Sequence, residues 1–156
     1  WRADVAPRAM YFAAGSGGTQ GGIVLGAQTH GLDFALNGVL VEGKSADGID
    51  RAVEVGGWAA AELGVGAPPR ERYLADDGHV GEGYGIPTKE GIEAIQLLAR
   101  TEAVLLDPVY TSKAFAGMVA DIRGGVYSPD DSVIFLHTGG SPALFAQRDL
   151  LQAALS

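Results

Sequence analysis

Residues 10–27 read MYFAAGSGGTQGGIVLGA, and this stretch decides the fold class of the chain. An apolar run, Met10 to Ala14, precedes a glycine-rich segment, and a second apolar run, Ile23 to Ala27, follows it. We interpret the three parts as a buried strand, a tight turn and the start of a helix. The turn, Gly15 to Thr19, contains three glycines and two hydroxyl groups. Its backbone N–H groups can converge on one anion beside the positive end of the helix, so we predict a phosphate site.

The same alternation of strand, turn and helix continues along the chain. Short apolar runs predict further strands at residues 39–41, 104–106 and 133–136. Helical periodicity predicts helices at 20–29, from Asp47 as N-cap to about Leu63, from Thr88 onward, over 115–122 before Gly124 and Gly125, and near the carboxyl end. Residues 64–85 contain Pro68, Pro69 and several glycines and are predicted to be irregular.

This order predicts an α/β fold with three layers, in which helices flank a mainly parallel sheet. Ligands of such sheets bind at the carboxyl ends of the strands. Three candidate motifs follow predicted strands, and we expect them to meet there: Gly15–Thr19, Asp107–Lys113 and His137–Gly140.

Composition excludes several classes of partner. The chain has 156 residues, 47% of them apolar, and a formal net charge of -8 without a cluster of Lys or Arg. These values indicate one globular domain and argue against a nucleic-acid partner. No apolar run approaches the roughly 20 residues of a membrane span, and the chain has no cysteine, so we expect no membrane association and take the cytoplasm as the default location. The chain opens on Trp1 without an initiator methionine, as a processed, trimmed or partial chain would.

Two nucleotide motifs require assessment. Residues 38–45, GVLVEGKS, match the P-loop pattern letter for letter. We reject this match, because Val39 to Val41 is typical of a strand and Glu42 would repel phosphate. A dinucleotide fingerprint on Gly15 and Gly17 needs a glycine where Gln20 stands, although Glu42 has the position of the acid that binds ribose. That interpretation, and a turn that binds nothing, remain alternatives.

The three histidines, at positions 30, 79 and 137, are isolated in the sequence. Because none has the spacing of a metal-binding pair, we expect them to be structural or on the surface, and we predict no metal site.

Four motifs in order resemble a known family. They are GSGGTQ at 15–20, EGYGIP at 82–87, LDPVYTSK at 106–113 and HTGGSPALF at 137–145. The chain from about Ala13 to Gln147 resembles the carboxyl-terminal half of the D-cysteine desulfhydrase and 1-aminocyclopropane-1-carboxylate deaminase family. The members of that family are pyridoxal-phosphate enzymes of fold type II, the tryptophan synthase beta-like fold.

The resemblance implies roles for individual residues. The cofactor phosphate would be held by Gly15, Ser16, Gly17, Gly18 and Thr19. Tyr84 and Tyr110 match two active-site tyrosines that lie near the substrate and assist proton transfer, and Thr111, Thr138 and Gly139 would contact the cofactor. Because a phenol with its usual pKa of about 10 is a poor base, a neighbouring cation or the cofactor would have to activate it.

Two threonines separate subgroups of this family. The deaminase pattern has Glu after the second tyrosine and no hydroxyl before the paired glycines, whereas this chain has Thr111 and Thr138. A carboxylate at the pyridine nitrogen keeps it protonated, while hydroxyl groups leave it closer to neutral, which suffices for β-elimination of sulfide. We therefore expect a lyase that acts on a small amino acid, D-cysteine, and releases sulfide, pyruvate and ammonia. A 1-aminocyclopropane-1-carboxylate deaminase and a cysteate sulfo-lyase are the alternatives.

The family's Schiff-base lysine belongs to its amino-terminal half. None of Lys44, Lys89 and Lys113 lies in the corresponding motif, and we interpret Lys113 as structural or at the rim of the site. Residues 1–156 are therefore expected to form one cofactor-binding segment, inactive alone, of a longer homodimeric enzyme. A non-catalytic module that binds phosphate or cofactor is the alternative from a different class.

Overall fold

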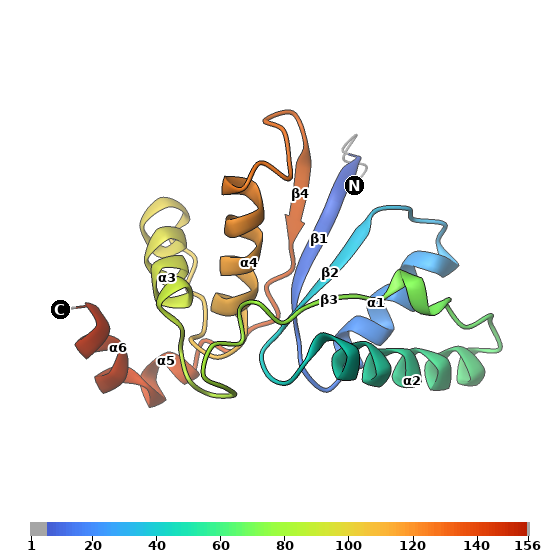
Figure 1. The fold of residues 1–156 in the computed structure, drawn as a ribbon, viewed down its shortest axis with the longest axis horizontal. Helices are drawn as coiled ribbons and strands as arrows, with labels where there is room; N and C mark the ends of the chain where they lie inside the picture. Colours follow the sequence, from blue (N-terminus) through green and yellow to red (C-terminus); the bar gives the residue numbers. More distant parts are fainter. Residues whose placement is uncertain (1–5, 156) are drawn as a thin grey trace.

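The computed structural model of the chain describes residues 6–155, and Trp1 lies outside this range. Its centre is a sheet of four parallel strands in the order β3-β2-β1-β4 (Figure 1). The strands are β1 (Pro7–Ala14), β2 (Ala35–Leu40), β3 (Leu74–Asp76) and β4 (Ser132–Phe135). The predicted parallel α/β fold is confirmed.

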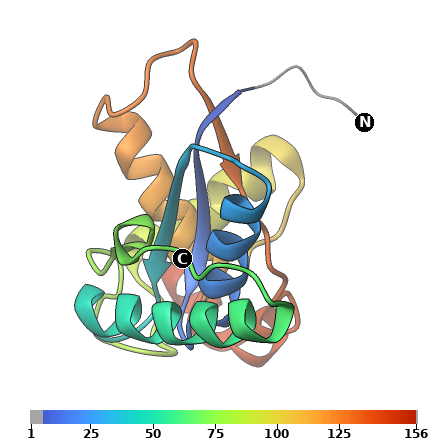
Figure 2. The same ribbon diagram turned by 90° about the vertical axis from the view of Figure 1, so that its right-hand side faces the viewer.

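Helices cover both faces of the sheet. In Figure 1, α1 (Gly18–Thr29) and α2 (Ser45–Leu63) lie on one side, and α3 (Lys89–Glu102) and α4 (Thr111–Arg123) lie on the other. Figure 2 shows α2 crossing in front of the strands. The smaller elements are η1 (Arg70–Arg72), α5 (Ala143–Ala146) and α6 (Arg148–Leu155). Within residues 6–155, no helix combines the length and the apolar character that crossing a membrane requires.

Alternate residues of β1 supply the two halves of the core, because successive side chains of a strand point to opposite faces. Tyr11 and Ala13 pack in one apolar cluster with residues of α4 such as Phe115. Phe12 packs in the other cluster with Val24 of α1. The three-layer arrangement therefore follows from the apolar run at residues 10–14.

Two local predictions are wrong. Asp47 is not the N-cap of α2: Lys44 takes that position, and Asp47 lies in the first turn, where the positive end of the helix favours a carboxylate. Residues 104–106 do not form a strand. The Leu105 carbonyl instead accepts a hydrogen bond, 2.9 Å long, from Nε2 of the His137 side chain. This apolar segment is held beside the sheet without joining the backbone ladder.

The segment predicted to be irregular contains one strand. Leu74–Asp76 pairs in parallel with β2 from Asn37 to Val39, and β2 itself begins at Ala35, earlier than predicted. A strand of three residues is too short to show a periodic pattern. A buried side chain supports it: the amide nitrogen of Gln20 crosses from α1 and donates to the Leu74 carbonyl at 2.6 Å.

Candidate functional site

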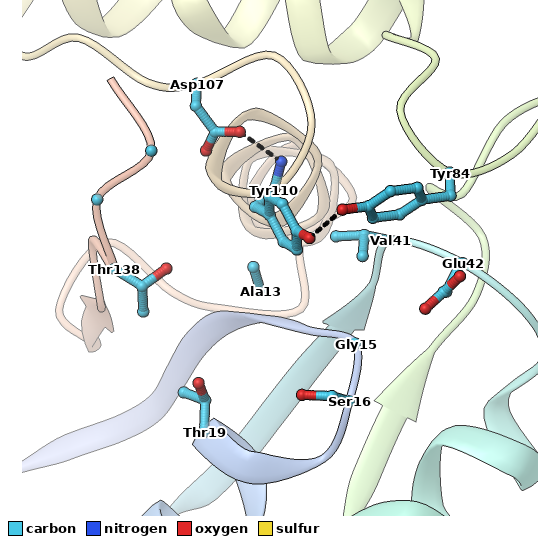
Figure 3. Close-up of a pocket in the computed structure, with 12 residues that line it drawn as sticks. Ala13, Gly15, Ser16, Thr19, Val41, Glu42, Tyr84, Asp107, Tyr110 and Thr138 are labelled. Carbon is cyan, nitrogen blue, oxygen red and sulfur yellow. Dashed lines mark hydrogen bonds between the residues drawn. The ribbon is translucent and has the colours of Figure 1, made fainter. Parts of the chain in front are cut away.

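A cavity of about 490 Å³ opens at the carboxyl ends of the strands. It is large enough for a small cofactor together with a substrate. The lining residues, drawn in Figure 3, are Ala13, Gly15, Ser16, Thr19, Val41, Glu42, Tyr84, Asp107, Tyr110, Thr138, Gly139 and Gly140. The structure thus brings together all three motifs that were predicted to meet at this edge.

The turn between β1 and α1 has the geometry of an anion site. Gly17 has φ 88° and ψ -17° and is the N-cap of α1, a position from which glycine offers no side chain to the first amides of the helix. A Cβ on Gly17 would lie 2.8 Å from the Arg51 carbonyl carbon. Only glycine fits this backbone conformation and this close approach to α2. The first N–H groups of α1 are therefore left for an anion from outside the helix.

Arg51 supports the turn from α2. Its Nε donates to the Gly15 carbonyl at 3.0 Å, which keeps that acceptor occupied. Its Nη2 is buried and has no hydrogen-bond partner among the described residues. Arg51 does not line the cavity, but its guanidinium brings a positive charge into contact with the turn.

Ser16 and Thr19 contribute the hydroxyl groups of the turn. Both line the cavity, and Figure 3 shows them on the turn below Thr138 and Tyr110. Gly17 and Gly18, which the sequence also assigned to the phosphate site, shape the turn and do not line the cavity.

Asp107 organises the wall of the cavity that lies opposite the turn at residues 15–19. Its buried carboxylate accepts hydrogen bonds from the backbone N–H groups of Val109, Tyr110 and Thr111, at 2.7–2.9 Å. These amides lead into α4, so the carboxylate satisfies the start of that helix and sets the position of Tyr110. Gly140 packs directly on the carboxylate: it has φ +91°, and a Cβ there would lie 2.7 Å from the Asp107 Cγ.

The two threonines of the predicted cofactor set have different surroundings. Thr111 is fully buried, and its hydroxyl donates to the Asp107 carboxylate at 2.6 Å and accepts from the Asp107 N–H at 2.8 Å. It is not among the lining residues, whereas Thr138 and Gly139 are. Figure 3 shows the Thr138 hydroxyl on the side that faces Tyr110. Of the two hydroxyl groups, that of Thr138 is the one available to a ligand.

The two predicted active-site tyrosines form a pair. Their hydroxyl groups share a hydrogen bond, and their rings meet edge to face at 77° with centroids 5.8 Å apart. The bond with Tyr84, burial and the charges of Tyr84, Glu42 and Asp107 raise the pKa of Tyr110 to about 12. Tyr110 is therefore protonated at neutral pH, and no lysine or arginine among the described residues lines the cavity to reverse this effect.

Three residues contribute to this site in ways that the sequence did not indicate: Glu42, Asp107 and Arg51. Glu42 was considered only as a possible ribose ligand, although its place directly after the apolar run of β2 puts it at the cavity edge. Asp107 stands before a helical stripe, as a capping residue does, and that pattern was the available signal. Arg51 approaches the turn from α2, and nothing in the sequence indicates this contact.

None of the three lysines, all of which lie within residues 6–155, lines the cavity. Lys44 is exposed and lies 3.8 Å from Asp77. Lys89 begins α3 and is exposed. Lys113 is fully buried, and its Nζ donates to the carbonyls of Val80 and Gly83 at 2.7 and 2.9 Å.

The turn at residues 15–19, the buried Asp107 carboxylate and the tyrosine pair meet at the carboxyl edge of a parallel sheet, where α/β proteins bind their ligands. Comparison with family models specifies the class: residues 2–139 match the model of the pyridoxal-phosphate dependent enzymes. The chain belongs to this family, and pyridoxal phosphate is the family's cofactor.

Two solved structures allow an architectural comparison. One described as an ACC deaminase homologue is 31% identical with a TM-score of 0.88, over 98% of this chain and 46% of that one. A fungal L-serine ammonia-lyase from Rhizomucor miehei is 18% identical with a TM-score of 0.58, over 96% of this chain and 50% of that one. The second likeness concerns the fold alone. The chain spans half or less of the length of these two proteins.

The residues present fit pyridoxal phosphate. The uncapped start of α1 and the Ser16 and Thr19 side chains that line the cavity suit the dianionic phosphate. Gln20, which replaces a glycine of the dinucleotide fingerprint, is buried and bonded to Leu74 and does not line the cavity. The P-loop alternative also finds no support, because Gly38 lies inside β2, where a Cβ would meet the Gln20 side chain at 2.9 Å.

Proposed function

We propose that this chain is the cofactor-binding segment of a pyridoxal-phosphate lyase that acts on a small amino acid, with D-cysteine as the substrate. The observation that carries the proposal is the cavity in which the turn at residues 15–19 faces Thr138 and the Tyr84–Tyr110 pair. The likeness to a structure described as an ACC deaminase homologue supports the amino-acid substrate class. The resemblance of Thr111 and Thr138 to the desulfhydrase pattern favours sulfide release over deamination.

The residues of the site divide the work between binding and proton transfer. The turn at residues 15–19 binds phosphate through its N–H groups and hydroxyls, and Arg51 holds the turn in shape. Thr138, which lines the cavity, would contact the cofactor ring, where a hydroxyl leaves the ring nitrogen near neutral, whereas Thr111 acts indirectly through its hydrogen bond to Asp107. Pyridoxal phosphate, when bound, supplies the electron sink for loss of the substrate's Cα proton.

The tyrosine pair serves the leaving group. In D-cysteine β-elimination, the Cα–H and Cβ–S bonds break, and one water is consumed as pyruvate, ammonia and hydrogen sulfide form. The departing sulfur requires a proton or a hydrogen bond. Tyr110 is protonated at neutral pH, and we assign its hydroxyl the hydrogen bond to the departing sulfur, with Tyr84 beside it.

The lysine that takes the Cα proton lies outside this chain in our proposal, because none of its lysines lines the cavity. Incubation with pyridoxal phosphate, borohydride reduction and peptide mapping test this point. We expect absent or diffuse lysine labelling. A single stoichiometric label that Thr19→Ala removes would show that the chain contains its own reactive lysine.

Activity is tested by joining the chain to the remaining part of the ACC deaminase homologue. We expect sulfide and pyruvate from D-cysteine. Sulfite from cysteate, or ammonia and 2-oxobutyrate from 1-aminocyclopropane-1-carboxylate, would assign one of the alternative activities.

A non-catalytic cofactor-binding module is the second candidate, favoured by the absence of a lining lysine among the described residues. Replacing Tyr84 and Tyr110 by Phe separates the two candidates. In a lyase the exchange suppresses turnover, whereas a module needs no tyrosine and retains its ligand affinity.

A further inference from the structure

The segment that carries Tyr84 has little means of fixing its own conformation. Residues 81–85 read GEGYG, and its three glycines, Gly81, Gly83 and Gly85, have φ of +68°, +151° and +78°. Glycine loses more conformational freedom on ordering than any other residue. Tyr84 itself is 54% exposed. Contacts from outside the segment must therefore determine where its hydroxyl lies.

Lys113 provides such contacts from the helix that Tyr110 precedes. Its Nζ binds two backbone carbonyls before Tyr84 in the chain, those of Val80 and Gly83. On the other side of Tyr84, the side chain of Gln147 donates to the Gly85 carbonyl at 3.2 Å. Tyr84 thus lies between Gly83 and Gly85, whose carbonyl groups both accept hydrogen bonds from side chains outside the segment.

The position of Lys113 is unfavourable for stability. The side chain is 0% exposed, and among the ion pairs of residues 6–155 none includes it. It is also in the first turn of α4, where the helix dipole disfavours a cation. Burial alone lowers the pKa of its ammonium group. A buried cation without a carboxylate is costly, and an apolar residue of similar size is often as stable or more so.

We propose that Lys113 is a positioning residue of the active site, which holds the Tyr84 hydroxyl against that of Tyr110. One ammonium group ties the two motifs together, because Lys113 lies three residues after Tyr110 and binds the carbonyl next to Tyr84. The benefit of this contact to turnover rests on the function proposed above. The contact itself exists without cofactor or substrate, so it is tested separately.

The test is the pKa of Tyr110 in the full chain, followed by NMR of tyrosine labelled at the ring carbon that bears oxygen. In the Lys113→Met variant we expect this pKa to fall from about 12 toward the ordinary value of about 10, because Tyr84 leaves its partner. Removing a cation that acted directly on Tyr110 would raise the pKa instead, so the direction of the shift separates the two effects. The control is Lys89→Met, at an exposed lysine.

The same substitution made in a Tyr84→Phe protein tests whether Lys113 affects Tyr110 through Tyr84. When Tyr84 is Phe, the pKa of Tyr110 is already lowered, and Lys113→Met should change it no further. The proposal is overturned if Lys113→Met leaves the pKa near 12, or if it lowers the pKa equally in the Tyr84→Phe background. It is also overturned if Lys113→Met and Lys113→Leu both fail to fold, since the lysine would then be structural.

Failure of this test leaves the proposed lyase activity intact, because that activity is measured by sulfide release. Conversely, a chain with no activity on D-cysteine would still show the Tyr110 shift if Lys113 holds the pair.

Discussion

The turn at residues 15–19 leads to a specific prediction for Gly17. Exchange for alanine places a methyl group 2.8 Å from the carbonyl carbon and oxygen of Arg51 and 2.9 Å from the Ala52 nitrogen. These are backbone atoms of α2, so no side chain can rotate to relieve the contact. The φ of 88° is also in the region that disfavours residues with a Cβ.

The magnitude follows from these two terms. A left-handed conformation costs a residue with a Cβ about 1–2 kcal/mol, and an extra methyl in a packed contact costs about 1–3 kcal/mol. Gly17→Ala should therefore lower the free energy of unfolding by about 2–5 kcal/mol. The added methyl group would also push the turn away from α2 and misplace the turn's N–H groups, so we expect affinity for inorganic phosphate to fall as well.

Urea unfolding followed by circular dichroism measures the stability change, with Gly22→Ala as the matched control. Gly22 lies in the same helix and is exposed, and a Cβ added there would meet no neighbouring group within 4 Å. Alanine there should raise the unfolding free energy by about 0.5–1 kcal/mol, because glycine is a poor helix former. Equal stability of Gly17→Ala and the unchanged protein would refute the close approach of the turn to α2.

Three further predictions concern the walls of the site. Arg51→Met removes the bond to the Gly15 carbonyl and the nearby positive charge. Calorimetric titration with phosphate should show binding weaker by roughly tenfold to a hundredfold, since a hydrogen bond to a charged group is worth about 1.5–3 kcal/mol. Thr111→Val should destabilise the fold by about 1–3 kcal/mol in urea unfolding, whereas Thr138→Val should leave stability within about 0.5 kcal/mol and weaken cofactor binding instead. Burial lowers the pKa of Lys113 in the folded protein below its unfolded value of 10.5. The unfolded state therefore binds more protons, and the free energy of unfolding rises as the pH approaches 10.5. In unfolding measurements across pH, Lys113→Met should lack this rise.

The architecture was readable from the sequence because its main signals are local. The run from Met10 to Ala14 fills both faces of β1, and glycine punctuation marks the ends of α1 and α4, which lie close to their predicted bounds. Residues 104–106 show the limit of such signals. Their apolar character reports burial, and Leu106 is fully buried, but pairing with a strand depends on backbone neighbours that the pattern does not contain.

The site was readable to the extent that its parts follow strands. The motifs around Ser16, Tyr110 and Thr138 were expected at one edge, and the structure gathers them in one cavity together with Tyr84. The sequence did not indicate that Thr111, next to Tyr110, lies outside the cavity lining. Its hydroxyl is turned onto Asp107, and this contact depends on the local turn.

The electrostatics of the cavity determine which proton transfers this chain can perform. Each neighbour that acts on Tyr110 raises its pKa: Tyr84 by hydrogen bonding, and Glu42 and Asp107 by their negative charges. A phenol in such surroundings stays protonated at neutral pH, so it donates a hydrogen bond and does not act as a base. Lowering its pKa would require a nearby cation, and carboxylates have the opposite effect. In the lyase that we propose, Tyr110 is therefore not the base for the substrate's Cα proton, and the tyrosine pair is suited to hydrogen bonding with the leaving group.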